Sequence, residues 1–406
     1  MRAVAHVRDQ WFRPSASGSG RERTARYGVG RRWLVSYQDT SGRRHAKSFD
    51  KKVDAERYLA LMGADVARGA WVDPALGRTK FGGYAREWLA TKTFDVSTRE
   101  QVENRLRLYA YPTWEDVPLA RIRAAAVQKW LAELTQRLSP GTVRQAFIHF
   151  SSILSAAVDD EMLAKNPCKS RSVVPPAVPR PRVVPWPMAR VRAVIEAHPD
   201  RYRALPAVGA AAGLRQGEIF GLAVDDIDFL RRTIHVVRQV KYVRNQLVFA
   251  PPKYGTGRDV PLSDALAVVL SEHIRQFTPV TVELPWGDPG AAKVRKVKVP
   301  LLFTSRESKA LNRNYINQFI WKPALADAGV APMRSNGMHA LRHFCASNWL
   351  EQGVSIRAVA EYLGHRDEGF TLRTYTHLMP TAEEKTRLAS DALFVDERDK
   401  AVSQPK

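Results

Sequence analysis

The sequence predicts a multidomain, mainly α protein with small β elements, and three observations support this fold class. The chain has 406 residues, and at roughly 150 residues per domain this length favours about three domains. Apolar and polar residues alternate from Trp33 to Tyr37, as they do in a strand. Apolar residues recur at helical spacing over 79–166 and, between a few short strands, over most of 188–394.

The composition describes a globular and strongly basic protein. Hydrophobic residues make up 45% of the chain and charged residues 26%, which excludes a mostly disordered or collagen-like protein. The 63 Lys and Arg residues exceed the 41 Asp and Glu residues, so the formal net charge is +22. Such a surplus favours a nucleic acid partner over simple solubility or an anionic membrane, because duplex DNA carries one negative charge per roughly 1.7 Å.

Signals for export and membrane insertion are absent from the sequence. No apolar stretch approaches the roughly 18 residues of a membrane helix, and the charged residues between Met1 and Arg13 leave no room for the apolar segment of a signal peptide. Cys168 and Cys345 are the only cysteines, so we expect no disulfide framework, which fits a reducing cytosol. The expectation is a cytoplasmic protein without a membrane partner.

A small β-β-α domain is expected near the start of the chain. Residues 1–30 are rich in Arg, Gly and Ser and are expected to be mobile. Two strands and a helix then follow over 31–75. A set of basic residues predicts that one face of this unit contacts DNA: Arg31, Arg32, Arg43, Arg44, Lys47, Lys51 and Lys52.

The middle of the chain predicts a four-helix domain over 79–167. Ser97 and Glu100 have the spacing of a capping box at the start of one helix. Ser139 and Pro140 have the types expected for the N-cap and first position of another helix.

Beyond this domain, the prolines of 168–187 predict an extended basic linker. A mixed domain over 188–395, with a basic hairpin insertion at 278–300, and a tail at 396–406 complete the expected organisation.

The first two segments that contain candidate site residues each present a cationic side chain. Arg215 lies between Gly213 and Gly217 in an apolar context, where a guanidinium requires an anion. That anion is either Glu218 alone or a ligand phosphate, with Glu218 then fixing the guanidinium. Lys253 follows two prolines at a predicted strand end, so a loop presents its ammonium group.

The remaining stretches add histidines, an arginine and a tyrosine. His339 and Arg342 are three residues apart on a predicted helix and therefore share a face. His365 ends a helix, and Tyr375 follows ten residues later. Each residue alone is more often structural. Two arginines, a lysine, two histidines and a tyrosine together favour phosphoryl transfer without a metal, in which the phenol attacks phosphorus and the lysine protonates the leaving oxygen.

The order and approximate spacing of five segments resemble the active-site boxes of tyrosine recombinases, the phage integrase family. These segments are 213–218, 252–253, 339–342, 363–365 and 371–377. The β-β-α unit resembles the arm-type DNA-binding domain of such integrases, and the helical segment resembles their core-site-binding domain. The resemblance implies a site-specific recombinase that cuts and rejoins DNA through a 3′-phosphotyrosyl intermediate and integrates or excises a phage or mobile element.

The resemblance also implies a role for each site residue. Arg215 and Arg342 would clamp the scissile phosphate, and Lys253 would be the general acid, with Lys241 as its rival. His339 would assist proton transfer at the nucleophile, and His365 would donate to a non-bridging oxygen.

Tyr375 would be the nucleophile, supported by Glu218 through Arg215. Tyr362, the other candidate nucleophile, is expected to pack in the core because it lies in an apolar helix with Val359 and Leu363.

The implied partners are double-stranded DNA attachment sites and three further copies of the chain, in a homotetramer on DNA. No ATP, metal or other cofactor is implied, and the implied location is bacterial and nucleoid-associated when the protein is bound to DNA. The segment Thr381–Phe394 is expected to form an amphipathic helix that docks on a neighbouring subunit. An excisionase and a DNA-bending host factor remain open as further partners.

Three alternatives remain. A type IB-like topoisomerase shares the chemistry but relaxes supercoils, and the arm-like domain argues against it. A metal-binding hydrolase could use His339, His343, Cys345, His365 and His377, but position 340 is Ala where a zinc protease carries its catalytic Glu. A DNA-binding regulator with a decayed site is disfavoured, because nothing essential is missing.

Overall fold

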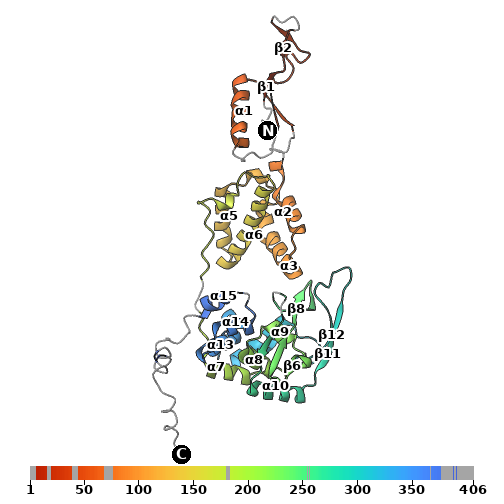
Figure 1. Cartoon of the computed structure of the whole chain (residues 1–406), viewed down its shortest axis with the longest axis vertical. Helices are drawn as coiled ribbons and strands as arrows, with labels where there is room; N and C mark the ends of the chain where they lie inside the picture. Colours follow the sequence, from red (N-terminus) through yellow and green to blue (C-terminus); the bar gives the residue numbers. More distant parts are fainter. Residues whose placement is uncertain are drawn as a thin grey trace, which may run out of the picture. The chain divides into compact units, whose positions relative to one another are not determined.

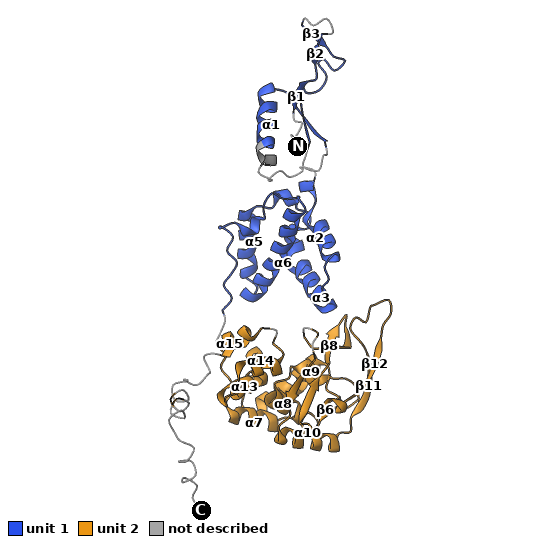
Figure 2. Ribbon diagram, in the orientation of Figure 1, with its two compact units in different colours: residues 1–179 blue, residues 180–406 orange. Residues whose placement is uncertain are grey.

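The computed structural model describes residues 6–15, 20–38, 44–67, 76–179, 183–253, 255, 257–365, 367–375, 387 and 390 (Figure 1). The chain divides into two compact units, residues 1–179 and 180–406 (Figure 2). Within these described ranges, no helix has both the length and the apolar character needed to cross a membrane.

The first unit begins with a three-stranded antiparallel sheet in the order β1-β4-β5. Its strands are β1 (His6–Asp9), β4 (Trp33–Gln38) and β5 (Arg44–Phe49), and α1 (Lys52–Ala67) packs on them through a small core around Val35 and Ala55. The predicted β-β-α unit is therefore present, with one additional strand.

The prediction that residues 1–30 are mobile is wrong for their described part. β1 pairs with β4 from His6 opposite Ser36 to Asp9 opposite Trp33, so the domain begins before residue 31. A hairpin of β2 (Phe12–Pro14) and β3 (Arg21–Arg23) occupies the connection. Composition did not reveal β1 because its partner β4 lies more than 20 residues further along the chain, and this pairing supplies the order that the basic sequence lacks.

The rest of the first unit is a helical bundle around buried aromatic residues. Phe150 lies within 5.2 Å, centroid to centroid, of Phe81, Trp114 and Trp130, so one ring joins three segments of the bundle. Its segments are η1 (Leu76–Arg78), α2 (Phe81–Ala90), α3 (Val96–Arg105), η2 (Leu106–Ala110), α4 (Tyr111–Trp114), η3 (Leu119–Arg121), α5 (Ala124–Thr135), α6 (Pro140–Asp159) and η4 (Pro167–Lys169).

The structure confirms one of the two predicted helix N-caps and replaces the other. Ser139 caps α6 and Pro140 is its first residue, as predicted. The N-cap of α3 is Asp95 and not Ser97, because the Asp95 carboxylate accepts hydrogen bonds from the backbone N–H of Thr98 and from the Ser97 hydroxyl. α3 therefore begins at Val96, and the amide that the Asp95 carboxylate satisfies is that of Thr98.

The second unit combines helices with three small sheets. The strands β10, β7 and β6 form one sheet in that order, and β8–β9 and β11–β12 form antiparallel hairpins. The hairpin predicted at 278–300 is therefore present. The β elements are β6 (Ile227–Asp228), β7 (Thr233–Val236), β8 (Gln239–Val243), β9 (Gln246–Ala250), β10 (Arg258–Pro261), β11 (Val280–Pro285) and β12 (Lys296–Leu301).

The helices of the second unit carry most of its core. They are α7 (Met188–Glu196), α8 (Asp200–Ala212), α9 (Gln216–Phe220), η5 (Val224–Asp226), α10 (Asp264–Gln276), α11 (Arg313–Ile316), η6 (Asn317–Trp321), α12 (Lys322–Asp327), η7 (Arg334–Asn336), α13 (His339–Glu351), α14 (Ile356–Leu363) and α15 (Glu368–Tyr375). The helix expected at Thr381–Phe394 lies outside the described residues, except for Arg387 and Ser390.

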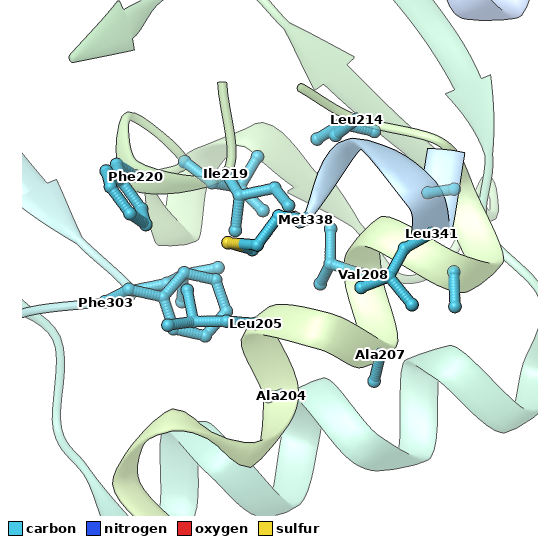
Figure 3. Close-up of a cluster of buried hydrophobic side chains, with 14 of the residues drawn as sticks. Ala204, Leu205, Ala207, Val208, Leu214, Ile219, Phe220, Phe303, Met338 and Leu341 are labelled. Atoms are coloured by element: carbon cyan, nitrogen blue, oxygen red, sulfur yellow. The ribbon is translucent and has the colours of Figure 1, made fainter. Parts of the chain in front are cut away.

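A hydrophobic cluster fixes α8, α9 and α13 against one another. Figure 3 shows Val208 of α8, Ile219 of α9 and Leu341 of α13 among its side chains. Gly209 allows α8 and α13 to pack closely, because a Cβ atom there would lie 3.3 Å from Leu341 Cδ1. Since Arg215 precedes α9 and Arg342 follows Leu341, this cluster holds the backbone beneath both arginines.

Candidate active site

A tight turn between α8 and α9 presents Arg215. Gly213 ends α8 in the left-handed conformation, with φ 65°. A Cβ atom there would lie 2.6 Å from Leu363 Cδ2 and 3.3 Å from Cys345 Sγ, so both the conformation and the space require glycine. Arg215 is then the N-cap of α9.

Glu218 holds Arg215 in place. Arg215 Nη1 donates to Glu218 Oε1 at 2.8 Å, and the backbone N–H of Arg215 donates to Oε2 at 2.9 Å. The third contact of Arg215 runs from Nη2 to the carbonyl of Gly364 at 3.0 Å. Glu218 is therefore the paired anion of Arg215, and one-fifth of the arginine side chain remains exposed.

Arg258 contributes a third guanidinium to the site and was not among the predicted residues. It lies at the start of β10, its side chain is 8% exposed, and its two terminal nitrogens donate to the Glu218 carboxylate. Its Nε donates to the carbonyl of Tyr362 at 2.6 Å. Burial acts to raise the pKa of Glu218, but the hydrogen bonds and charges of Arg258 and Arg215 outweigh it and lower this pKa to about 2.

Arg342 is almost completely buried on α13, with 1% exposure. Its Nη1 donates to the carbonyl of Gly213 at 2.7 Å, and its Nη2 donates to the carbonyl of Leu363 at 2.5 Å. Burial and then the charge of Arg215 lower the pKa of Arg342 to about 9, so it remains a cation at neutral pH. Carbonyl groups are its hydrogen-bond partners among the described residues, which leaves a buried positive charge able to bind an anion.

His365 follows the left-handed Gly364 at the end of α14. Its Nδ1 lies 2.6 Å from Thr371 Oγ1, and Thr371 is completely buried, so the imidazole orientation is fixed. Burial, followed by the charges of Arg342 and Arg215, lowers the pKa of His365 to about 3. The imidazole is therefore neutral at physiological pH.

His339 and His343 lie one above the other at the start of α13. Their ring centroids are 4.6 Å apart in an edge-to-face arrangement. Burial is the main cause that lowers the pKa of each to about 4, and the charges acting on His339 include Lys253. Lys253 is exposed on the segment after β9 and interacts electrostatically with His339.

Tyr375 ends the described part of α15 and is 1% exposed. Its hydroxyl lies 2.7 Å from Nδ1 of His343, which is its hydrogen-bond partner among the described residues. Burial raises the pKa of Tyr375 to about 12 against the opposing charge of Arg342. From sequence, His343 was only a metal-ligand candidate, and its position directly after Arg342 was the available signal of a role at this site.

The structure therefore links some of the predicted residues by hydrogen bonds and others only by electrostatic interactions. Hydrogen bonds to the turn 363–364 link Arg215, Arg342 and, through its neighbour Gly364, His365. Electrostatic interactions join His339 to both arginines and to Lys253. Tyr362 is half-buried and packs against the hydrophobic core, edge-to-face on Trp349 with a centroid distance of 5.9 Å, in agreement with the prediction of a packing role.

The metal-binding alternative gains no support from the described part of the chain. Those residues contain no group of three His, Cys, Asp or Glu side chains placed to hold a metal ion. Cys345 is buried, and burial raises the pKa of its thiol, which disfavours the thiolate that would bind a metal. His377 lies outside the described residues.

The fold and this arrangement belong to a class of DNA-cleaving enzymes, the tyrosine recombinases. The family model of the phage integrase family matches residues 188–381, and that of the phage integrase central domain matches residues 81–172. The chain belongs to the phage integrase family.

Individual relatives agree with this membership. The putative prophage phiRv2 integrase of Mycobacterium tuberculosis is 28% identical over 357 residues, which cover 85% of this chain and 88% of the relative. A XerC-like tyrosine recombinase of Caldanaerobacter subterraneus is 26% identical, covering 68% of this chain and 72% of that protein.

Solved structures show the same fold at low sequence identity. The Tn1549 transposon integrase in complex with a circular intermediate DNA has a TM-score of 0.64 and 16% identity, covering 77% of this chain and 99% of that one. A lambda integrase tetramer bound to a Holliday junction has a TM-score of 0.56 and 13% identity, and the match covers 84% of this chain and 92% of that one.

Proposed function

We propose that this protein is the integrase of a phage or other mobile element. It cuts and rejoins DNA at attachment sites through a 3′-phosphotyrosyl intermediate, and it integrates or excises the element. One observation carries the proposal: Arg342 and Arg215 each donate a hydrogen bond to the same turn, to Leu363 and Gly364 respectively, directly before His365. Two guanidinium groups held on one turn provide a binding site for a phosphodiester.

In this proposal the arginines and His365 stabilise the transition state. Phosphoryl transfer places negative charge on the non-bridging oxygens, and fixed donors lower its energy because they need no reorganisation. Arg215 is fixed by Glu218, and Arg342 by two carbonyls. When the Thr371 hydroxyl donates to Nδ1 of His365, the neutral imidazole carries its hydrogen on Nε2 and can donate it to a non-bridging oxygen.

The covalent step exchanges one phosphate ester for another. The Tyr375 oxygen bonds to phosphorus as the bond from phosphorus to the 5′ oxygen breaks, so the free energy of the diester is kept in the tyrosyl ester. Lys253 gives the leaving oxygen its proton. Its coupling to His339 supports Lys253 over Lys241 as this acid.

The proposed partners are double-stranded DNA and three further copies of this chain. The formal net charge of +22 supports contact with the DNA backbone. The relative solved as a tetramer on a Holliday junction supports the same assembly here. The sheet around β4 is proposed to bind arm-type DNA, the helical bundle to bind the core site, and Thr381–Phe394 to dock on a neighbouring subunit. An excisionase and a DNA-bending factor are proposed as regulators of direction.

A two-duplex assay tests this function. The protein is incubated with two labelled linear duplexes that carry the attachment sites of its own element, and the products are separated by size. Exchange of the flanking arms is the expected result. Relaxation of supercoiled plasmid without arm exchange would indicate a topoisomerase instead. The absence of any covalent protein–DNA adduct on these duplexes would contradict both.

A further inference from the structure

His343 is the side chain that contacts the hydroxyl of the proposed nucleophile. Its Nδ1 lies 2.7 Å from the Tyr375 oxygen, a short distance for a hydrogen bond between a nitrogen and an oxygen. The two residues come from different helices, α13 and α15, and are 32 positions apart in the chain. Their contact therefore depends on the tertiary fold.

The imidazole of His343 is held in one orientation from both sides. Its ring packs edge-to-face against His339, with centroids 4.6 Å apart, and against Tyr375, with centroids 5.7 Å apart. His343 directly follows Arg342, so the α-helix fixes its position relative to the proposed phosphate site.

The direction of the hydrogen bond follows from the protonation states. The pKa of Tyr375 is raised to about 12, so its phenol is protonated at neutral pH. Burial and the charge of Arg342 lower the pKa of His343 to about 4, so its imidazole is neutral. The phenol therefore donates, and Nδ1 accepts with a free lone pair while Nε2 carries the ring hydrogen.

We propose that His343 is the catalytic base that receives the phenolic proton of Tyr375 during strand cleavage. As the tyrosyl oxygen bonds to phosphorus, its proton moves to Nδ1 of His343, and the bond to the 5′ oxygen breaks with a proton from Lys253. On religation His343 returns the proton to the phenol. This inference rests on the proposed function of Tyr375. It adds His343 to the proton transfer expected of His339, and the rings of the two histidines are in contact.

DNA binding itself makes His343 a better base. The charge of Arg342 is one cause of the low basicity of His343, and the Coulomb interaction between them weakens when an anion pairs with the arginine. A scissile phosphate bound at Arg215 and Arg342 supplies that anion. Proton acceptance is therefore coupled to the arrival of the substrate, and the DNA-free protein keeps its nucleophile protonated and buried.

The test replaces His343 by asparagine. His343→Asn keeps a carbonyl oxygen near the position of Nδ1, so it can accept the hydrogen bond but cannot take the proton. His198→Asn is the matched control, because His198 is also buried and its Nδ1 lies 2.6 Å from the carbonyl of Val194. Single-turnover adduct formation is measured on a nicked duplex with the element's attachment site, after thermal unfolding has established that both variants are folded.

The wild-type adduct, mapped to Tyr375 by peptide sequencing, establishes the proposed function independently of the variants. We expect His343→Asn to bind the duplex normally but to form the adduct about 100-fold more slowly, within the range of a lost general base. His198→Asn should stay within about threefold of wild type. A fluorinated tyrosine at position 375, which ionises at lower pH, should restore most of the rate to His343→Asn.

Three results would overturn the proposal. A rate for His343→Asn close to wild type means that acceptance of a hydrogen bond is sufficient. A faster rate means that His343 restrains the nucleophile and does not activate it. A slow rate that the fluorinated tyrosine fails to restore means that the histidine has only a structural role.

Discussion

Arg258 and Glu218 form a bidentate ion pair inside the catalytic unit, with nitrogen–oxygen distances of 3.1 Å and 2.7 Å. The same carboxylate accepts the side chain and the backbone N–H of Arg215. Two guanidinium groups therefore share one carboxylate, and the excess positive charge remains available for a phosphate. This pairing explains how Arg215 is held ready without being neutralised.

Removal of Arg258 should reduce catalysis as well as stability. Arg258→Ala leaves Glu218 with Arg215 alone, so Arg215 turns toward the carboxylate and away from the phosphate. Adduct formation should fall at least tenfold. The control is Arg238→Ala, because Arg238 also pairs with a buried carboxylate, that of Asp226. Equal effects of both variants on the rate, after correction for the folded fraction, would contradict a positioning role for Arg258.

Glu218→Gln should lower the free energy of unfolding and remove part of the dependence of this free energy on pH. The pKa of Glu218 is lowered from 4.5 to about 2 in the folded protein, so the unfolded chain binds the proton first. The stabilisation of the folded protein by the ionised Glu218 is complete above about pH 4.5 and is lost as the pH falls toward 2. We expect Gln to cost about 3 kcal/mol at pH 7, the range for breaking a buried ion pair.

Urea unfolding of wild type and Glu218→Gln at several pH values checks this expectation. The difference between their unfolding free energies should shrink as the pH falls below 4.5. A difference that stays constant down to pH 2 would show that the carboxylate is not stabilised in the folded state.

Gly213→Ala tests the turn that presents Arg215. Gly213 and Gly329 both have positive φ, 65° and 69°, but a Cβ atom at 329 meets nothing within 4 Å, whereas one at 213 meets Leu363. Gly329→Ala should cost about 1 to 2 kcal/mol from conformation alone. Gly213→Ala should cost about 1 to 3 kcal/mol more from overpacking. Thermal unfolding compares the two, and equal costs would refute the steric part of the account.

Lys253 should be dispensable when the leaving group needs no proton. Lys253→Ala should slow cleavage of a normal phosphodiester by about 100-fold. A substrate with sulfur in place of the 5′ bridging oxygen leaves as a thiolate, and its cleavage should be nearly unaffected. Lys241→Ala serves as the control. Sulfur rescue of Lys241→Ala and not of Lys253→Ala would identify Lys241 as the general acid.

Local sequence patterns were sufficient to group those candidate site residues that lie close together in the chain. Arg215 with Glu218, and His339 with Arg342, are close in sequence, so spacing alone was sufficient to group them. The β-hairpin at 278–300 was predictable because turn residues separate its two halves. These features depend on contacts between near neighbours, which sequence patterns report directly.

Arg258 and the role of His343 could not be predicted in this way. Arg258 meets Glu218 across 40 residues, and its position at the start of a short strand gave no sign of burial. His343 meets Tyr375 only because α13 and α15 come together in the fold. Both contacts are set by tertiary packing, which a single sequence does not encode in its periodicity.

The basic face predicted near the N-terminus is partly engaged within the protein. Arg32, expected to contact DNA, donates to the Asp9 carboxylate through Nε and Nη2 at 3.1 Å and 2.9 Å. The prediction omitted Asp9 because it treated residues 1–30 as unstructured. Arg43, in the same predicted set, lies outside the described residues.

The direct measurement of the central claim is covalent trapping with Tyr375→Phe. Wild type and variant are incubated with a nicked attachment-site duplex and separated on a denaturing gel. We expect equal DNA affinity, an adduct with wild type that maps to Tyr375, and none with the variant. An adduct of equal yield in Tyr375→Phe would contradict the assignment of this phenol as the group that attacks phosphorus.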